Sequence, residues 1–158
     1  MEECTVCHPV VDGELLSIRK QRGVGEGKIV GAGGAVEAGE TVREAAIREV
    51  EEELRVTPAG VEKLGEVDFH FRDDTEDDDS LFVHVFRAEG IDGEPEQTPE
   101  AVPRWDPVSQ PPYEEMWPDD RIWLPHLLDR RRFQGTFVLD DDGESMRFYE
   151  VELDVTFG

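Results

Sequence analysis

The sequence predicts an α+β or mixed α/β fold in a single domain that covers residues 1–158. Three observations predict it. Strand patterns rich in β-branched and aromatic residues recur along the chain, and helical patterns interrupt them in two places. Asp-Gly pairs separate neighbouring strand patterns near both ends, which is typical of hairpin turns. A chain of 158 residues suffices for one domain with a sizeable core, and no internal repeat is visible.

The N-terminal part of the chain predicts a hairpin followed by a loop. The segments Cys4 to Val11 and Glu14 to Lys20 read as strands, and the pair Asp12-Gly13 between them is a strong turn signal. Glycines punctuate the stretch Gln21 to Val30, which we therefore expect to be a loop.

A helix is predicted to begin near Thr41 and to end before Pro58. Thr41 and Glu44 form a capping-box pair, and the run Val42 to Leu54 lacks Gly and Pro. At about 100° per residue, one stripe of this helix is apolar and a neighbouring stripe is acidic. The apolar stripe is Ala46, Ile47, Val50 and Leu54, and the acidic stripe is Glu49, Glu52 and Glu53.

The second half of the chain predicts further strands, one helix and a closing hairpin. The expected strands are Val61 to Arg72, Leu81 to Ala88, Ala101 to Trp105, Phe133 to Leu139 and Met146 to Leu153. The last two flank Asp142-Gly143, and a helix is expected from Asp119 or Asp120 to Arg130. We expect Asp73 to Asp79 to be an exposed, solvated charge run rather than a calcium site, and Glu89 to Pro99 to be a loop.

The net charge of the chain argues against some classes of binding partner. With 39 acidic and 16 basic residues the formal net charge is −23, which argues against a nucleic-acid polymer as partner. We expect a surface that tolerates or requires high salt, and an acidic docking face for a basic partner is the alternative. The absence of a long apolar run and of a basic-apolar leader predicts a soluble cytoplasmic protein without membrane contact.

Cys4 and Cys7 suggest a metal or redox pair, but they lie within a predicted strand. Residues three apart on a strand point to opposite faces of the sheet. A second pair of ligands is also missing from the sequence. Reduced thiols in a cytoplasm are therefore the simpler interpretation.

The acidic stripe of the first helix is the strongest chemical signal. Three carboxylates on one side of one turn repel each other, and beside a core they need a cation to compensate them. Mg²⁺ is the usual choice where a polyphosphate supplies further ligands. A solvated acidic helix face is the alternative, and the glycines Gly33 and Gly34 together with Arg48 weigh against it.

The neighbours of the acids support a metal site. The glycines in Gly31 to Gly34 allow the backbone to approach closely and leave a carbonyl as a further ligand, although they could also form only a flexible turn. Arg48 can hold one glutamate through a bidentate pair. Its alternative role is that of a surface partner for Glu44 or Glu52.

The spacing of these residues resembles a known motif. Gly34, Glu40 six positions later, and the run Arg48-Glu49-Val50-Glu51-Glu52-Glu53-Leu54-Arg55-Val56 match a Nudix box, except that Arg55 replaces its last glycine. The whole chain resembles the oxidised-purine nucleoside triphosphatases related to MutT, in their animal form. The further matching segments are Arg22-Gly23-Val24-Gly25-Glu26-Gly27, Val83-His84-Val85-Phe86, Trp105, Met116-Trp117-Pro118-Asp119-Asp120 and Phe133-Gln134-Gly135. The resemblance implies the Nudix fold, an α/β sandwich with a mixed sheet between helices.

The resemblance also implies a base-binding site. In that family a tryptophan stacks on the purine and two aspartates bond its edge, which assigns these roles to Trp117, Asp119 and Asp120. One aspartate is expected to be protonated so that it can donate to a purine oxygen. Without the resemblance, Trp117 would be taken as a core residue and Asp119 as a helix N-cap. The family pattern also makes Glu100 an additional acid near the metal, although from sequence alone it is an exposed loop glutamate. Lys20 lies at the end of the second predicted strand, where it could contact a phosphate or simply be solvated.

Three positions depart from the family pattern. Ile29-Val30 stands where a Trp-Asn pair is usual, so one base-edge hydrogen bond is lost. Ala35 replaces a common lysine, and Arg55 suggests a different C-cap for the helix. Hydrolysis is therefore a firmer expectation than selectivity for an oxidised base.

The expected reaction is metal-assisted pyrophosphohydrolysis of a nucleoside triphosphate to the monophosphate and pyrophosphate, by a protein expected to be a monomer. The ligands of Mg²⁺, or of Mn²⁺, would be Glu49, Glu52, Glu53, Glu100 and the carbonyl of Gly33. One of Glu49, Glu53 and Glu100 would act as the base. Two alternatives remain, a Nudix hydrolase of another nucleoside diphosphate derivative and a non-catalytic nucleotide sensor.

Overall fold

The computed structural model describes residues 2–23, 25–71, 80–140 and 143–157. Within these residues the main sheet has nine strands in the order β11-β10-β6-β7-β1-β2-β3, with β4 paired to β1 and β9 paired to β2. Its strands are β1 (Glu2–Val11), β2 (Glu14–Lys20), β3 (Ile29–Val30), β4 (Ala32–Ala35), β6 (Glu62–Phe71), β7 (Leu81–Ala88), β9 (Ala101–Pro107), β10 (Phe133–Leu139) and β11 (Met146–Leu153). A separate small sheet pairs β5 (Thr57–Ala59) with β8 (Gly90–Asp92).

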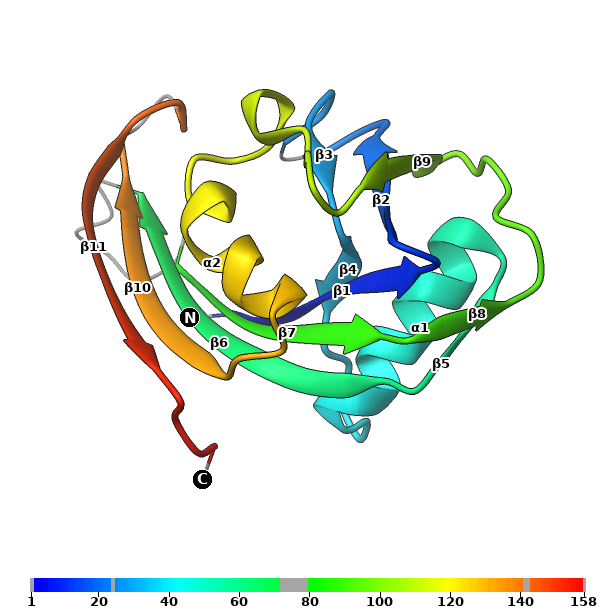
Figure 1. The fold of residues 1–158 in the computed structure, drawn as a ribbon, viewed down its shortest axis with the longest axis horizontal. Helices are drawn as coiled ribbons and strands as arrows, with labels where there is room; N and C mark the ends of the chain where they lie inside the picture. The colour runs from blue at the N-terminus through cyan, green and yellow to red at the C-terminus, as the bar shows by residue number, and fades with distance from the viewer. Residues whose placement is uncertain (1, 24, 72–79, 141–142, 158) are drawn as a thin grey trace.

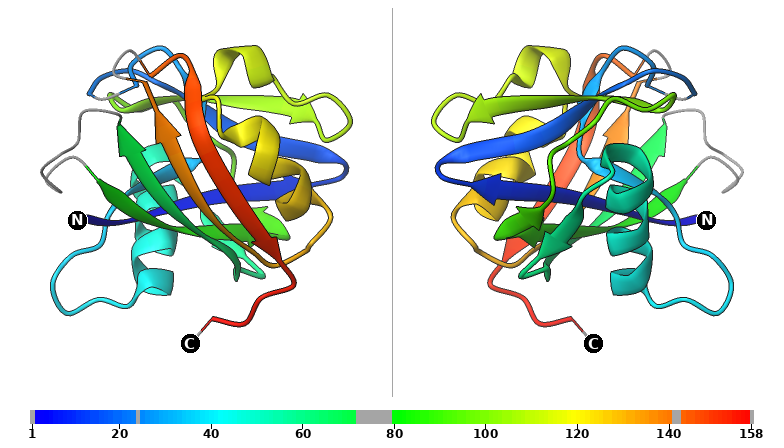
Figure 2. Two further views of the ribbon diagram at one scale, coloured as in Figure 1. Left: turned by 90° about the vertical axis from the view of Figure 1, so that its left-hand side faces the viewer. Right: turned by 90° about the vertical axis from the view of Figure 1, so that its right-hand side faces the viewer.

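The sheet is mixed and lies between two helices, as predicted. Strand β1 runs parallel to β7, and β10 runs parallel to β6, whereas the remaining pairs are antiparallel. Helix α1 (Val42–Leu54) packs near β1 and β4, and α2 (Asp120–Leu128) lies on the other side, where β6, β10 and β11 curve around it (Figures 1 and 2). Each helix therefore has its own buried cluster against the sheet.

Helix α1 begins as the sequence predicts and ends in an unexpected conformation. The Thr41 side chain accepts a hydrogen bond from the Glu44 N–H at 3.1 Å, and the Glu44 carboxylate accepts one from the Thr41 N–H at 2.8 Å. At the other end Arg55 has φ 61° and ψ 29°, the left-handed conformation that glycine favours. The expectation of a different C-cap is therefore wrong, because the arginine adopts the backbone conformation typical of a C-terminal glycine.

Both predicted pairs of consecutive strands form, one inside the sheet and one at its edge. Between β1 and β2, Asp12 and Gly13 both have positive φ, 52° and 78°, as a two-residue hairpin turn requires. Strands β10 and β11 pair antiparallel over the predicted residues. Asp142 of the second turn, and the predicted charge run Asp73 to Asp79, lie outside the described residues.

Four short strands were missed by the sequence analysis. Strand β3 lies at the end of the predicted loop Gln21 to Val30, and β4 covers most of the glycine-rich segment that follows it. Strand β8 lies in the predicted loop Glu89 to Pro99, where it pairs with β5. Strands of two to four residues carry too little periodicity to be recognised, and they form here because a paired strand already offers its backbone groups.

The two cysteines occupy different environments of β1. Cys7 is fully buried in the cluster under α1, whereas Cys4 is only partly buried and lies level with Val83 of β7, a strand residue that faces the α2 side. Both are free thiols, and burial raises the pKa of each to about 12. Neither described helix is long and apolar enough to cross a membrane.

Candidate active site

Two acids of α1 turn inward against the glycines of β4. The Gly33 N–H donates a hydrogen bond to Glu53 Oε2 at 3.2 Å. A Cβ added to Gly34 would lie 2.7 Å from Glu49 Oε1, and one added to Gly33 would lie 1.9 Å from the Thr5 carbonyl oxygen. At Gly33 only glycine therefore lets β4 pair closely with β1, whereas a side chain at Gly34 would displace the Glu49 carboxylate from its present position.

Arg48 ties these acids to the loop before α1. Its Nε and Nη2 atoms lie 3.0 and 2.7 Å from the two oxygens of Glu40, so the predicted bidentate pair is present. Its Nη1 donates to Glu49 at 2.8 Å, and its Nη2 donates to the Ala35 carbonyl at 3.1 Å. Hydrogen bonds from Arg48 and from the Glu37 backbone lower the pKa of Glu40 to about 2. Arg48 therefore positions Glu49 rather than serving only as a surface partner.

The other two expected acids lie apart from this pair. The Glu52 side chain is 60% exposed and touches only the edge of the Arg48 network, at 3.3 Å from Nη1. Glu100 is 48% exposed and forms an ion pair with Arg22, whose hydrogen bond lowers the pKa of Glu100. Within the described part of the chain, no three His, Cys, Asp or Glu side chains are already arranged around one point.

Burial makes the inner pair of carboxylates hard to ionise without a cation. Burial and the charge of Glu49 raise the pKa of Glu53 to about 8, although the Gly33 N–H and the charge of Lys20 oppose the rise. Burial also raises the pKa of Glu49, although Arg48 opposes the shift. A buried and a partly buried carboxylate beside a backbone strand offer the oxygen ligands that hard divalent ions take, so these residues fit such an ion.

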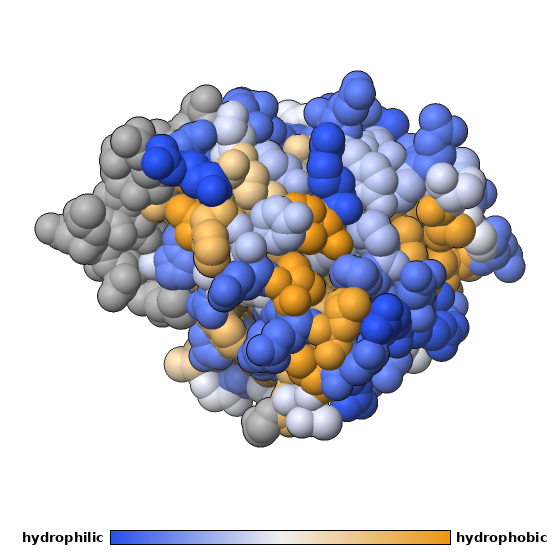
Figure 3. Space-filling view, turned by 60° about the vertical axis from the view of Figure 1, so that its left-hand side comes forward, coloured by the Kyte–Doolittle hydropathy of each residue, from blue (hydrophilic) through white to orange (hydrophobic). Residues whose placement is uncertain are grey.

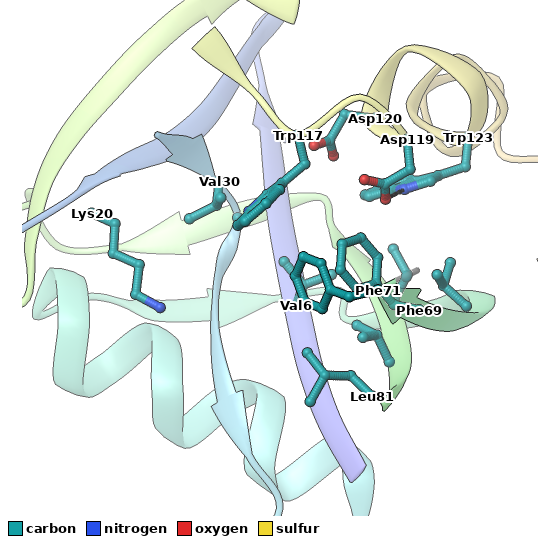
Figure 4. Close-up of a pocket in the computed structure, with 14 residues that line it drawn as sticks. Val6, Lys20, Val30, Phe69, Phe71, Leu81, Trp117, Asp119, Asp120 and Trp123 are labelled. Carbon is teal, nitrogen blue, oxygen red and sulfur yellow. Dashed lines mark hydrogen bonds between the residues drawn. The ribbon is translucent and has the colours of Figure 1, made fainter. Parts of the chain in front are cut away.

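A cavity of 220 Å³ opens between α2 and the sheet, and its walls are mostly apolar (Figure 4). It is lined by Val6, Lys20, Val30, Gly31, Val67, Phe69, Phe71, Leu81, Val83, Val85, Trp117, Asp119, Asp120 and Trp123. In Figure 4 the two aspartates and Trp123 lie to one side of Trp117, and Lys20 lies to the other. An apolar cavity with a few convergent polar groups is the usual form of a small-molecule site.

The predicted base-binding residues meet in this cavity. The rings of Phe69 and Phe71 meet Trp117 edge-on, with centroids 5.8 and 6.2 Å away. Asp119 Oδ2 accepts a hydrogen bond from Trp123 Nε1 at 2.7 Å, and its Oδ1 is buried without a hydrogen-bond partner among the described residues. The side chain of Asp119 makes no N-cap bond to α2, so the helix-cap role does not account for it.

The two neighbouring aspartates share a buried environment. Burial raises the pKa of Asp119 to about 6. Burial and the charge of Asp119 raise the pKa of Asp120 well above its usual range. Because both pKa values are raised, one of the two carboxyl groups keeps its proton at pH values at which an aspartate is normally ionised. The pair therefore offers a hydrogen-bond donor beside an acceptor.

Lys20 connects the two parts of the site. It lines the cavity, and its positive charge lowers the pKa of Glu53. Val30 also lines the cavity, at the place where an amide was expected from the family pattern. Its apolar side chain cannot bond the edge of a base.

Sequence reasoning missed three walls of the cavity. Phe69 and Phe71 were predicted only as alternating strand residues, and their role depends on α2 lying above them. Trp123 follows Asp119 by four residues, which is the spacing of neighbours on one face of a helix. That spacing is the one signal that could have linked Trp123 to the site in advance.

Fold and site together define the class of this protein. Residues 3–127 match the model of the NUDIX domain, and the chain belongs to the Nudix hydrolase family, whose members generally use a divalent metal ion. It is 41% identical to the oxidized purine nucleoside triphosphate hydrolase of Danio rerio over 128 residues, 81% of this chain and 80% of that protein. It is 36% identical to the Mus musculus hydrolase of the same name over 135 residues, 85% of each chain. The crystal structure of a MutT protein from Bacillus halodurans superposes with a TM-score of 0.86 at 27% identity, over 96% of this chain and 98% of that one.

Proposed function

We propose that this protein is a Mg²⁺-dependent pyrophosphohydrolase that cleaves purine nucleoside triphosphates, including oxidised ones such as 8-oxo-dGTP, and thereby cleans the nucleotide pool. The observation that carries the proposal is that Lys20 is close to both the apolar cavity and the buried Glu53. Lys20 lines the cavity suited to a base, and its charge acts on Glu53 of the acid pair suited to a metal. The names of the relatives in fish and mouse support the choice of substrate.

We propose that Glu49, Glu53 and the Gly33 carbonyl hold Mg²⁺, or Mn²⁺ in its place, and that Glu52 and Glu100 contribute when substrate is bound. When bound, the metal supplies positive charge for the phosphates and lowers the pKa of a water molecule. Arg48 keeps the Glu49 carboxylate in place through the 2.8 Å hydrogen bond. Lys20 meets the phosphate chain between the base and the acids.

The proton acceptor is one of Glu49, Glu53 and Glu100, and ion pairing favours Glu53. Glu49 is paired with Arg48, and Glu100 is paired with Arg22. Glu53 accepts a hydrogen bond from the Gly33 backbone N–H, and this bond is weaker than the charge-assisted bond that an arginine donates. Glu53 would take a proton from water, and the resulting hydroxide would form a bond to a phosphorus atom of the triphosphate. The P–O–P linkage between the α- and β-phosphates would break, which separates the nucleoside monophosphate from pyrophosphate.

Base recognition depends on three residues of the cavity. Trp117 provides the stacking surface, and Asp119, whose buried Oδ1 has no hydrogen-bond partner among the described residues, lines the cavity that the base would fill. Because one of the two aspartates keeps a proton, the pair bonds both donors and acceptors on a purine edge. Val30 contributes no hydrogen bond, so we expect weaker discrimination between purines than an amide at this position would give.

A panel of nucleotides tests this function. Ordinary and oxidised purine triphosphates, pyrimidine triphosphates and nucleoside diphosphate derivatives are incubated with Mg²⁺ or with EDTA, and pyrophosphate release is measured. We expect release from purine triphosphates only when the metal is present. Faster cleavage of a diphosphate derivative supports the alternative Nudix activity, and binding without cleavage over hours supports a nucleotide sensor.

We also propose that the protein acts in the cytoplasm as a monomer and that molar salt stabilises it. The net charge is −23, and many of the ion pairs among the described residues lie at exposed positions. Figure 3 shows one face on which hydrophilic residues surround a central apolar area. At about 1 M salt the Debye length falls to about 3 Å, which suppresses repulsion between like charges.

The salt proposal has a direct test. The melting temperature is measured between 0.1 M and 3 M KCl, about the range over which screening becomes complete. We expect it to rise with KCl. An unchanged melting temperature across that range contradicts the proposal, and size-exclusion chromatography over the same range tests the monomer.

A further inference from the structure

The outer side of Trp117 is covered by residues that take no part in lining the cavity. The Lys28 ammonium nitrogen lies over the indole, 4.9 Å from the ring centroid. Lys28 is not among the residues that line the cavity, although Trp117 is. The same nitrogen lies 3.4 Å from a carboxylate oxygen of Glu144, which follows Gly143 in the turn before β11.

Two glycine backbones hold the indole between them. A Cβ added to Gly25 would lie 3.0 Å from Trp117 Cζ2, and one added to Gly143 would lie 2.7 Å from Cζ3. Both glycines have positive φ, 83° and 69°, so other residues are disfavoured there for two reasons. The ring is therefore oriented before any ligand arrives, and the contact with Lys28 is not needed merely to keep it in place.

The position of Lys28 is unusual for a chain of this composition. The sequence has 39 acidic residues and 16 basic ones, and one of its few lysines lies on the aromatic platform. Its side chain is only 19% exposed. Burial and Asp119 raise the pKa of Asp120, and the charge of Lys28 opposes that rise, which places the ammonium group near the aspartate pair as well.

A cation on one face of an indole changes what the other face prefers. The face of an aromatic ring carries partial negative charge, so two stacked faces repel each other electrostatically. A cation that is attracted to one face draws π-electron density toward itself and leaves the opposite face less negative. Such a face stacks better on an electron-rich base than an unperturbed indole does.

We propose that Lys28, anchored by Glu144, is a specificity-determining residue of the base site that makes Trp117 prefer electron-rich purines, guanine-type bases above adenine-type ones. The proposal rests on the proposed function, because it requires the base to stack on Trp117. It assigns Lys28 an indirect action through the indole, so Lys28 is a positioning and tuning residue rather than a catalytic one.

The test measures binding of GMP and of AMP by calorimetry in EDTA, so that neither metal nor turnover enters. Lys28→Met keeps an unbranched stem and removes the charge, and Lys28→Arg keeps the charge. We expect Lys28→Met to weaken GMP binding about three- to tenfold, the range of the electrostatic part of an aromatic stacking contact, and to weaken AMP binding less. Lys28→Arg should stay within about twofold of the wild type, because Arg makes the same contact. Glu144→Gln tests the anchor and should have a smaller effect than Lys28→Met.

The possible outcomes distinguish a failure of the Lys28 proposal from a failure of the proposed base site at Trp117. If Trp117→Ala weakens GMP binding and Lys28→Met leaves the ratio of GMP to AMP affinity unchanged, Lys28 does not tune the base site. Equal losses in Lys28→Met and Lys28→Arg also overturn the proposal, because charge is then irrelevant. Tighter binding in Lys28→Met shows that the lysine competes with the base. If Trp117→Ala has no effect, the base site itself is wrongly assigned. Lys28→Gln is the second neutral variant should the methionine variant fold poorly, as judged by melting temperature.

Discussion

The acid site and the base cavity each contain two carboxyl groups whose pKa is raised by burial, complete or partial, yet their surroundings differ completely. Glu49 and Glu53 face a backbone strand and the Arg48 network, a setting rich in oxygen and charge. Asp119 and Asp120 end an aromatic cavity, where Trp123 is a hydrogen-bond partner. Burial raises the pKa in both places, so burial alone does not reveal a role. The surrounding residues determine whether a pair of carboxyl groups suits a cation, as in the acid site, or retains a proton that can bond a base, as in the cavity.

Removal of one carboxylate of the acid site is expected to have the largest effect. Glu53→Gln is expected to lower turnover on a purine triphosphate in Mg²⁺ by at least about 100-fold, the lower range for lost acid-base help. Binding of GMP in EDTA should stay unchanged, because the base cavity does not contain Glu53. Steady-state pyrophosphate release and calorimetry measure the two effects.

The matched control is Glu51→Gln on the same helix turn. Glu51 is exposed, takes no part in the proposed metal site and accepts a hydrogen bond from the Thr57 hydroxyl at 2.9 Å. Loss of such a hydrogen bond changes stability by about 1 kcal/mol, so we expect turnover at 25 °C to stay close to that of the wild type. Equal losses in the two variants would contradict the division between an inner and an outer glutamate.

Removal of the stacking surface tests the base cavity separately from the acid site. Trp117→Ala is expected to weaken binding of purine nucleotides by about 5- to 150-fold, since stacking on an aromatic residue contributes about 1–3 kcal/mol per base. The turnover number at saturation should change less than KM, because the acids are untouched. Trp105→Ala removes a tryptophan of β9 that is 38% exposed, and it should leave KM unchanged. A loss of turnover without a change in KM places Trp117 outside the base site.

The same contrast explains how much the sequence could predict. The acid site belongs largely to one capped helix, and its spacing alone indicates a metal site. That spacing gave no sign that Glu52 turns outward, because helical periodicity does not say where the partner strand β4 lies. The base cavity combines residues of β6, α2 and the segment before α2, which only tertiary structure brings together. The family resemblance supplied Trp117, Asp119 and Asp120, and nothing in local pattern indicated Phe69 as a wall.

A smaller effect separates the two carboxyl pairs by their response to pH. The pKa of Asp119 is raised to about 6 in the folded protein. A raised carboxyl pKa means that the folded state binds more protons, so the stabilisation is present below about pH 4 and is lost as the pH rises through about 6. Asp119→Asn should remove about 2–3 kcal/mol of this pH dependence, at 1.36 kcal/mol per pKa unit.

Urea unfolding at several values between pH 4 and pH 8 measures this dependence. Asp92→Asn, at an exposed position of β8, is the control and should leave the slope of stability against pH unchanged. An Asp119→Asn variant with the slope of the wild type shows that the aspartate pair ionises normally. The cavity would then lack the donor that purine recognition requires.

The smallest expected effect concerns the end of the helix that carries the acids. Arg55 adopts φ 61° and ψ 29°, which costs a residue with a Cβ about 1–2 kcal/mol, whereas glycine loses about 0.5–1 kcal/mol through its greater freedom in the unfolded chain. Arg55→Gly should therefore stabilise the protein by about 0.5–1 kcal/mol, equivalent to roughly 1–4 °C in melting temperature for a chain of this size. Arg43→Gly, at a helical position of the same α1, should lower the melting temperature. Because Arg55 lies outside the carboxylates that face β4, turnover of Arg55→Gly at 25 °C should equal that of the wild type. A lower melting temperature, or a changed turnover below the unfolding range, means that Arg55 does more than end the helix, and the acid site then extends beyond Glu53.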